Sequence, residues 1–148
     1  MANSTREKLI QMLNKALELE HAARIQYLAH AENVNGLYAE EVEERLKEIA
    51  SDEAKHEGMY RNLLGNYLGV EPSMGLAPTQ SAKEISAILN VNVKAEKEAI
   101  DFYKQIYDFV IANKGEFKYE FETLEHEIRH IIVEEQEHVI ELQKLMSK

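Results

Sequence analysis

Residues 52–60 read DEAKHEGMY and residues 134–142 read EEQEHVIEL, and each stretch contains a glutamate three positions before a histidine. In a helix, positions three apart lie on the same face. Both pairs also fall on an apolar stripe, so they predict carboxylate and imidazole side chains inside a helical core. The pairs are Glu53 with His56 and Glu135 with His138.

Apolar side chains recur at alternating spacings of four and three residues, which is typical of antiparallel helix packing. Short turns that contain glycine join the first helix to the second and the third to the fourth, predicting two hairpins. Residues 69–79 read as a long crossover between them, and Ser81 with Glu84 has capping-box spacing. The sequence therefore predicts an all-α, antiparallel four-helix bundle. The predicted helices cover about residues 4–33, 39–68, 82–112 and 116–146.

The Glu-x-x-His spacing occurs four times in this glutamate-rich chain, but only the two quoted pairs place both members on a stripe. The pairs that begin at Glu18 and Glu127 lie off the stripe and are expected at the surface or on a flank. His30 falls on the stripe of the first helix, but His30, His126 and His130 are all expected at the surface or on a flank rather than among the ligands. Stripe position thus reduces four candidate pairs to two.

Each selected pair has a partner glutamate at matching height in its hairpin. Counted from the hairpin turns, Glu20 lies level with Glu53, and Glu96 lies nearly level with Glu135. The first and third helices also repeat one motif, which suggests that the halves of the bundle are copies of one hairpin. The motif is Glu20, Ala23 and Tyr27 in the first helix and Glu96, Ala99 and Tyr103 in the third.

The predicted core therefore holds four carboxylates and two imidazoles. An unpaired buried carboxylate costs several kcal/mol, and no Arg or Lys on the stripes offers a counter-charge. Two divalent cations would balance four carboxylates, and this donor set suits iron or manganese. Buried salt bridges or proton-sharing pairs are the alternative. The predicted metal ligands are Glu20, Glu53, His56, Glu96, Glu135 and His138.

Two tyrosines lie on the same faces as the unpaired glutamates. Tyr27 and Tyr103 follow Glu20 and Glu96 by two helical turns. One hypothesis is that they hydrogen-bond a ligand carboxylate across the bundle or pass an electron. The other is that they are core aromatic residues with satisfied hydroxyl groups.

The composition narrows the class of protein. The chain has 148 residues, so residues 1–148 are expected to form one domain, and the absence of cysteine excludes thiolate sites and disulfides. A net charge of −10 argues against nucleic-acid binding and favours attraction of cations. No apolar run has the length of a membrane span, and the N-terminus lacks a signal-peptide core. A cytoplasmic location is expected.

Residues 13–28, LNKALELEHAARIQYL, together with the two stretches quoted above, resemble the ferritin-like superfamily, especially bacterioferritin and the di-iron domain of rubrerythrin. One glutamate from each of two helices and Glu-x-x-His from the other two is the known template of this class. The resemblance implies two iron ions per chain that react with O₂ or H₂O₂. It implies terminal ligands Glu20 and Glu96, bridging ligands Glu53 and Glu135, and one histidine, His56 or His138, on each iron.

Some positions depart from these relatives. Ala54 replaces the methionine that binds haem in bacterioferritin, so haem is not expected, and Ala99 replaces an additional carboxylate of rubrerythrin. The sequence also lacks rubrerythrin's paired Cys-x-x-Cys motifs and shows no fifth helix after the fourth. A homodimer or another homo-oligomer is therefore expected at least as much as a storage cage.

The predicted function is oxidation of Fe(II) by O₂ or H₂O₂, in the manner of a ferroxidase or peroxidase. Iron storage in a shell is one alternative. Another is a di-iron oxygenase for a small organic substrate, which needs a cavity beside the site, with Ala23 and Ala99 as candidate lining. A structural protein with a vestigial site is disfavoured, because all six ligand positions are filled.

Overall fold

The computed structural model describes residues 4–147, and within this range it contains four long helices and no strand. A π-helical turn extends the second helix, and a 3-10 turn precedes the fourth. The predicted all-α four-helix bundle is confirmed. No helix in the described range is long and apolar enough to cross a membrane. The elements are α1 (Thr5–Asn33), α2 (Ala39–Asn62), η1 (Leu63–Tyr67), α3 (Ile85–Ala112), η2 (Lys114–Phe117) and α4 (Phe121–Met146).

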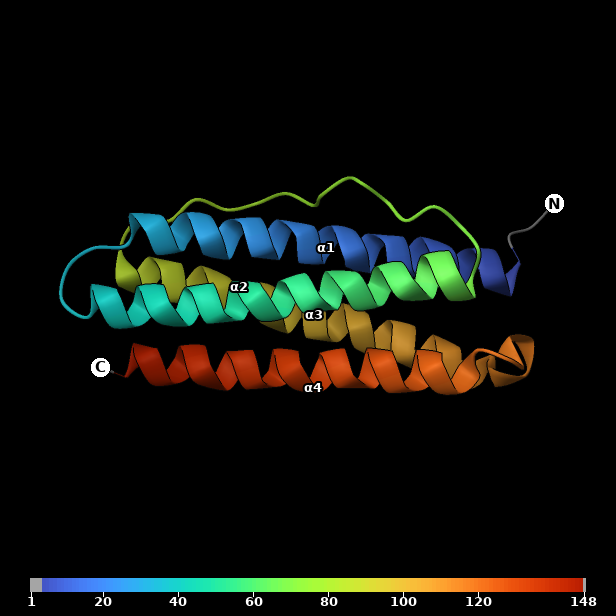
Figure 1. Cartoon of the computed structure of the whole chain (residues 1–148). Coiled ribbons are helices and arrows are strands. Elements are labelled where there is room, and N and C mark those ends of the chain that lie inside the picture. The colour runs from blue at the N-terminus through green and yellow to red at the C-terminus, as the bar shows by residue number, and fades with distance from the viewer. Residues whose placement is uncertain (1–3, 148) are drawn as a thin grey trace.

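The helices form two antiparallel hairpins, α1–α2 and α3–α4 (Figure 1). The two chain ends lie at opposite ends of the bundle. Residues 68–84 form the crossover between the hairpins, and they run the length of the bundle along α1. Backbone N–H groups fasten the crossover to α1: Ala77 donates to the Glu18 carbonyl at 3.0 Å, and Ser73 donates to the Asn14 side chain at 2.9 Å.

The start of α3 differs from the prediction. Ser81 and Glu84 do not form a capping box, because Glu84 occupies the N-cap position without a side-chain cap bond and the helix begins at Ile85. The crossover explains the difference. Both backbone groups of Gln80 are hydrogen-bonded to side chains of α1, which holds this stretch against α1 before the helix can begin.

The other hairpin ends also have local causes. The helix α4 begins at Phe121 rather than near residue 116, because η2 intervenes and buries Phe117. In the α1–α2 turn, Gly36 has a φ of 101° and Tyr38 a φ of 70°. Glycine adopts such positive φ values readily, because it lacks a Cβ atom.

A polar layer divides the hydrophobic core into two clusters. The first cluster includes Leu13 of α1 and Ile128 of α4, and the second includes Leu46 of α2 and Ile88 of α3. On each helix, a glutamate that is at most 2% exposed lies between residues of the two clusters. These glutamates are Glu20, Glu53, Glu96 and Glu135.

Candidate metal centre

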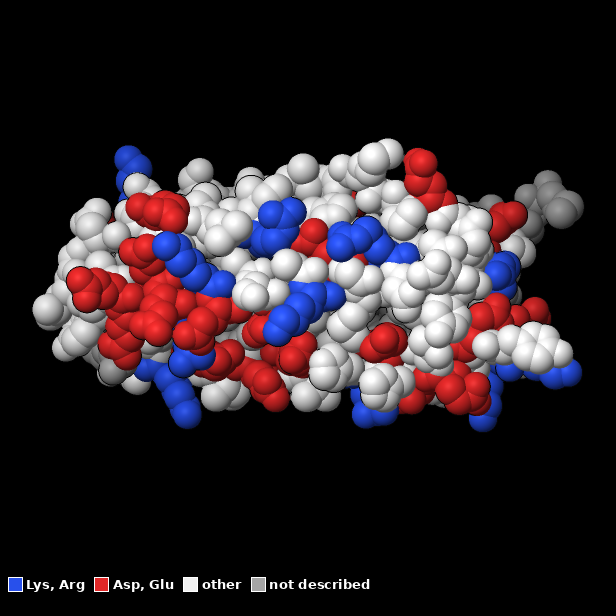
Figure 2. Space-filling view, viewed as in Figure 1, with Lys and Arg blue, Asp and Glu red and all other residues white. Residues whose placement is uncertain are grey.

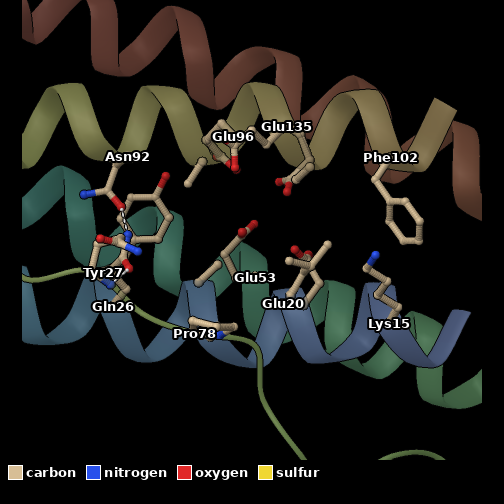
Figure 3. A pocket seen from close by; sticks show the side chains of 17 residues that line it. Lys15, Glu20, Gln26, Tyr27, Glu53, Pro78, Asn92, Glu96, Phe102 and Glu135 are labelled. Atoms are coloured by element: carbon tan, nitrogen blue, oxygen red, sulfur yellow. Dashed lines mark hydrogen bonds between the residues drawn. The ribbon is translucent and has the colours of Figure 1, made fainter. Parts of the chain in front are cut away.

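The six predicted ligands converge in the polar layer. All four helices contribute, and every one of the six residues is at most 2% exposed. Figure 3 shows the four carboxylates pointing toward one another from different helices. The six residues are Glu20 of α1, Glu53 and His56 of α2, Glu96 of α3, and Glu135 and His138 of α4.

Nδ1 of each histidine faces the carboxylates. His56 Nδ1 lies 2.7 Å from Glu20 Oε1 and 3.4 Å from Glu135 Oε1. His138 Nδ1 lies 2.8 Å from Glu96 Oε2 and 3.5 Å from Glu53 Oε1. The arrangement is thus nearly twofold-symmetric.

The donors form two overlapping groups, in each of which the ligand atoms lie within 4.8 Å of one another. Glu53 and Glu135 belong to both groups. Such an arrangement can hold two cations side by side that share two carboxylates. The groups are Glu20, Glu53, His56 and Glu135, and Glu53, Glu96, Glu135 and His138.

The shared carboxylates point most strongly to a cation site. Both oxygens of Glu53 and both oxygens of Glu135 are buried without a hydrogen-bond partner. A buried polar group without a partner is expensive, and a buried charge more so. Carboxylate oxygens with one imidazole nitrogen per ion form a donor set for iron or manganese. The residues present therefore fit the predicted metals.

Protons are concentrated in the centre when no cation is bound. Burial raises the pKa of the Glu53 and Glu135 carboxyls well above the usual value, and the charge of Glu20 raises it further. For the two histidines, burial acts against protonation, but hydrogen bonds to carboxylates outweigh it. They raise the pKa of His56 to about 10 and that of His138 to about 11.

Two acidic residues that the sequence did not single out orient the histidines. His56 Nε2 donates to Glu134 Oε1 at 2.7 Å, and His138 Nε2 donates to Asp52 Oδ2 at 3.0 Å. Each bond crosses between α2 and α4. Such contacts fix the ring orientation and leave Nδ1 for a metal. The sequence feature that could have identified them is an acidic residue directly before each shared glutamate, Asp52 before Glu53 and Glu134 before Glu135.

The two tyrosines have different contacts. The Tyr103 hydroxyl donates to Glu20 Oε2 at 2.9 Å, across the bundle. The Tyr27 hydroxyl is buried without a hydrogen-bond partner. Burial raises the pKa of Tyr27 well above its usual value, and the charge of Glu96 adds to this shift. Both hydroxyls therefore remain protonated beside the carboxylates.

The predicted position of His30 is wrong. The side chain is buried and belongs to a polar network, here called the amide clasp, which links α1, α3 and the crossover. His30 Nε2 donates to the Gln80 carbonyl, and Asn92 donates to His30 Nδ1 at 3.0 Å. Gln26 donates to Asn92 at 2.9 Å and accepts from the Gln80 N–H.

The remaining histidines lie outside the centre. His126 and His130 are exposed on α4, with side-chain exposures of 65% and 48%, as the sequence predicts. His21 instead donates to the Gly75 carbonyl of the crossover at 2.6 Å, and Glu18 accepts from Ser73. Neither of the other two Glu-x-x-His pairs, Glu18 with His21 and Glu127 with His130, reaches the buried carboxylates; their side chains contact the crossover or residues of α4.

A cavity of about 340 Å³ adjoins the four carboxylates between α1 and α3. Its lining includes Ala23 and Ala99, and Pro78 of the crossover covers it. Figure 3 shows Lys15 and Phe102 at one end of the cavity, and the Lys15 ammonium lies 5.0 Å from the centre of the Phe102 ring. The cavity that an organic substrate needs is present beside the centre.

The surface at one end of the bundle carries a surplus of negative charge. Figure 2 shows acidic side chains gathered at the end of the bundle where α2 begins. The first turn of α2 contains Glu40 and Glu41, and the net charge of the chain is −10. Such a surface raises the local concentration of cations.

Solved structures with the same architecture cover nearly the whole chain. A ferritin-like, diiron-carboxylate protein from Bacillus anthracis superposes with a TM-score of 0.86 at 24% identity, covering 97% of this chain and 99% of that chain. A dodecameric, bacterioferritin-related thioferritin from Bacteroides fragilis superposes with a TM-score of 0.82 at 28% identity, covering 96% of this chain and 86% of that chain. Bacterioferritin from Desulfovibrio desulfuricans superposes with a TM-score of 0.82 at 23% identity, covering 99% of this chain and 84% of that chain.

The sequence comparisons give the family. No curated protein matches the chain. The family model described as a ferritin-like domain matches residues 10–148, which is nearly the entire chain. Together with the bundle and its buried carboxylates, this match shows that the chain belongs to the ferritin-like domain family.

Proposed function

We propose that this protein is a di-iron carboxylate protein that oxidises Fe(II) with O₂ or H₂O₂. The observation that carries the proposal is the set of buried carboxylate oxygens of Glu53 and Glu135, which have no hydrogen-bond partner and lie between two imidazoles. Four carboxylates match the charge of two divalent ions. Manganese accepts the same donors.

The donor groups suggest a role for each residue. Glu20 and His56 would hold one ion, Glu96 and His138 would hold the other, and Glu53 and Glu135 would bridge them. The pair of irons supplies the electrons that reduce the oxidant. Glu134 and Asp52 keep the imidazoles turned toward the ions, while Tyr103 positions Glu20.

The surroundings favour small reactants. The negative surface attracts Fe(II), and the cavity between α1 and α3 gives O₂ or H₂O₂ room beside the carboxylates. Tyr27 also lines the cavity, where its protonated hydroxyl can donate to a bound oxidant or to Glu96. Neither role needs a protein partner.

Anaerobic Fe(II) titration followed by O₂ or H₂O₂ tests the proposal. We expect about two Fe(II) ions per chain, and a near-ultraviolet Fe(III) absorbance when the oxidant is added. Glu53→Ala and Glu135→Ala should each abolish rapid oxidation, because each removes a carboxylate shared by both donor groups. No iron uptake by the parent protein, or undiminished oxidation in both variants, would sink the proposal.

Glu137→Ala is the matched control. This residue is also a glutamate of α4, but its side chain is exposed and lies outside both donor groups. Circular dichroism of each variant confirms that the bundle is retained. Iron binding should be unchanged in the control, so that a loss in Glu135→Ala reports on the centre rather than on total charge.

The cavity supports a second candidate, oxygenation of a small organic substrate. Ala23 and Ala99 leave space next to the carboxylates, and the amides of Gln26 and Asn92 lie at one end. Ala23→Phe should fill this space and abolish turnover of such a substrate while two irons still bind. Compounds that accelerate O₂ consumption by the parent protein but not by Ala23→Phe would favour this candidate.

For assembly, we propose a homodimer or a larger homo-oligomer. The thioferritin from Bacteroides fragilis is dodecameric, and apolar side chains of this chain are exposed on α1 and on the crossover, including Ile25, Leu28 and Leu76. Iron storage is the alternative role that needs a closed shell. Native mass separates the two, because a monomer or dimer cannot enclose a mineral.

A further inference from the structure

The outer face of α4 carries a second group of metal-binding side chains that the centre does not use. Residues 126–130 read His-Glu-Ile-Arg-His, which places two histidines four positions apart on one helical face. Two histidines at this spacing on a helix can bind one divalent ion. The His126 and His130 rings lie stacked, with centroids 6.3 Å apart and planes tilted by 14°.

A carboxylate completes this group one turn further along α4. Glu134 Oε1 lies 3.4 Å from His130 Nε2. The same oxygen accepts from His56 Nε2 at 2.7 Å. Glu134 is 28% exposed, whereas His56 is fully buried. A continuous series of donors therefore leads from solvent to the edge of the centre.

The fold itself does not require these histidines. On α2, Asp52 is the counterpart of Glu134. Four residues before Asp52, where α4 has His130, α2 has Glu48, which is paired with Arg45 at 3.0 Å. On α4 the cation between the two histidines, Arg129, is paired with Glu125 at 2.6 Å. The guanidinium is thus bound elsewhere. The carboxylates beside the two imidazoles are Glu127, whose Oε2 lies 3.6 Å from His126 Nδ1, and Glu134.

We propose that His126, His130 and Glu134 form a solvent-facing site for one divalent transition-metal ion, and that Fe(II) passes from it to the buried centre. Two imidazoles and a carboxylate are suitable donors for Fe(II), Co(II) and Zn(II). Rotation of two exposed side chains brings the imidazoles onto a common ion. Binding at this outer site is independent of the function proposed above, whereas the passage of iron rests on it.

Equilibrium dialysis with Co(II) tests the outer site. We expect three ions per chain in the parent protein and two in His126→Ala/His130→Ala, because only the outer ion depends on the exposed imidazoles. If the centre bound no metal, the counts would be one and zero, which would overturn the proposed function but support the outer site. Equal counts in the two proteins would overturn the outer site.

The matched control is Glu122→Gln/Glu137→Gln. It removes two exposed carboxylates from the same helix and leaves the histidines in place. The control should keep three Co(II) ions per chain. A loss equal to that in the histidine variant would assign the third ion to general acidic attraction and overturn the proposal.

Stopped-flow loading with Fe(II) under anaerobic conditions tests the passage of iron. The His126→Ala/His130→Ala variant should fill the centre about tenfold more slowly, because a surface site raises the local ion concentration. The final content of the centre should stay at two irons. Loading at the parental rate would overturn the passage, even where dialysis supports the outer site.

Discussion

The α1–α2 and α3–α4 hairpins present the same donors to the centre but surround them differently. Each supplies one unpaired glutamate and one Glu-x-x-His pair. The first hairpin carries the crossover and most of the amide clasp, whereas the second carries the exposed His126 and His130. The donors follow the symmetry of the repeat, while the segments that cover and support them do not. Two chemically similar donor groups therefore have unlike surroundings.

The largest effect should come from removing one unshared glutamate. Glu20→Ala should lose the ion beside His56, and Glu96→Ala the ion beside His138, because each glutamate belongs to only one donor group. We expect iron content to fall from two ions to about one in each case. Metal analysis after anaerobic loading measures this. If one variant lost both irons and the other lost none, the two donor groups would not be equivalent.

A smaller effect is expected from the acids that orient the imidazoles. Glu134→Ala should weaken binding beside His56, and Asp52→Ala should weaken binding beside His138, by about 10- to 100-fold. Competition with a chelator of known affinity measures the change. Unaltered affinity in both variants would show that the rings are held in place by packing alone.

The metal-free protein should become less stable as pH rises from about 6.5. The folded-state pKa values of His56, about 10, and His138, about 11, lie above the unfolded value. Their contribution is fully present below pH 6.5 and is lost as pH rises through those values. The raised pKa values of Glu53 and Glu135 act in the same direction, beginning at lower pH.

Thermal unfolding of chelator-treated protein at several pH values measures this trend. His56→Gln and His138→Gln should each flatten the curve above pH 6.5, because each removes an imidazole whose pKa is raised in the folded protein. A melting temperature that rises from pH 7 to pH 10 would contradict the expected sign.

The smallest effect should come from the tyrosines. Tyr103→Phe removes the hydrogen bond to Glu20 and should lower the free energy of unfolding by about 1 kcal/mol. Tyr27→Phe should be neutral or slightly stabilising, because its buried hydroxyl has no hydrogen-bond partner. Urea unfolding of the metal-free variants distinguishes them. Equal losses in both would mean that the two tyrosines are equivalent.

The features that could be predicted from the sequence are those that repeat along a helix. The stripes placed Glu53 and His56 on the inner face, and hairpin height matched Glu53 with Glu20, without knowledge of any contact. The periodic signal is strong because burial on a helix recurs every three or four residues. The six buried donors could therefore be predicted from this recurrence together with height in the hairpin.

The missed features depend on contacts between distant segments. The roles of Asp52 and Glu134 require the relative rotation of α2 and α4, which no single stripe reports. His30 has its partners in Asn92 and in the backbone of Gln80, and backbone groups leave no mark in the sequence. The late start of α3 has the same origin.

The amide clasp sets the register of the two hairpins. A slide of α3 along α1 by one helical turn, about 5.4 Å, would separate Asn92 from Gln26 and leave buried amides without partners. Glu20 and Glu96 lie on the same two helices, so a sliding error would also misalign the carboxylates. The hydrogen bonds of the clasp therefore fix the position of α3 along α1, so that the carboxylates of the two hairpins are aligned without a bound ion.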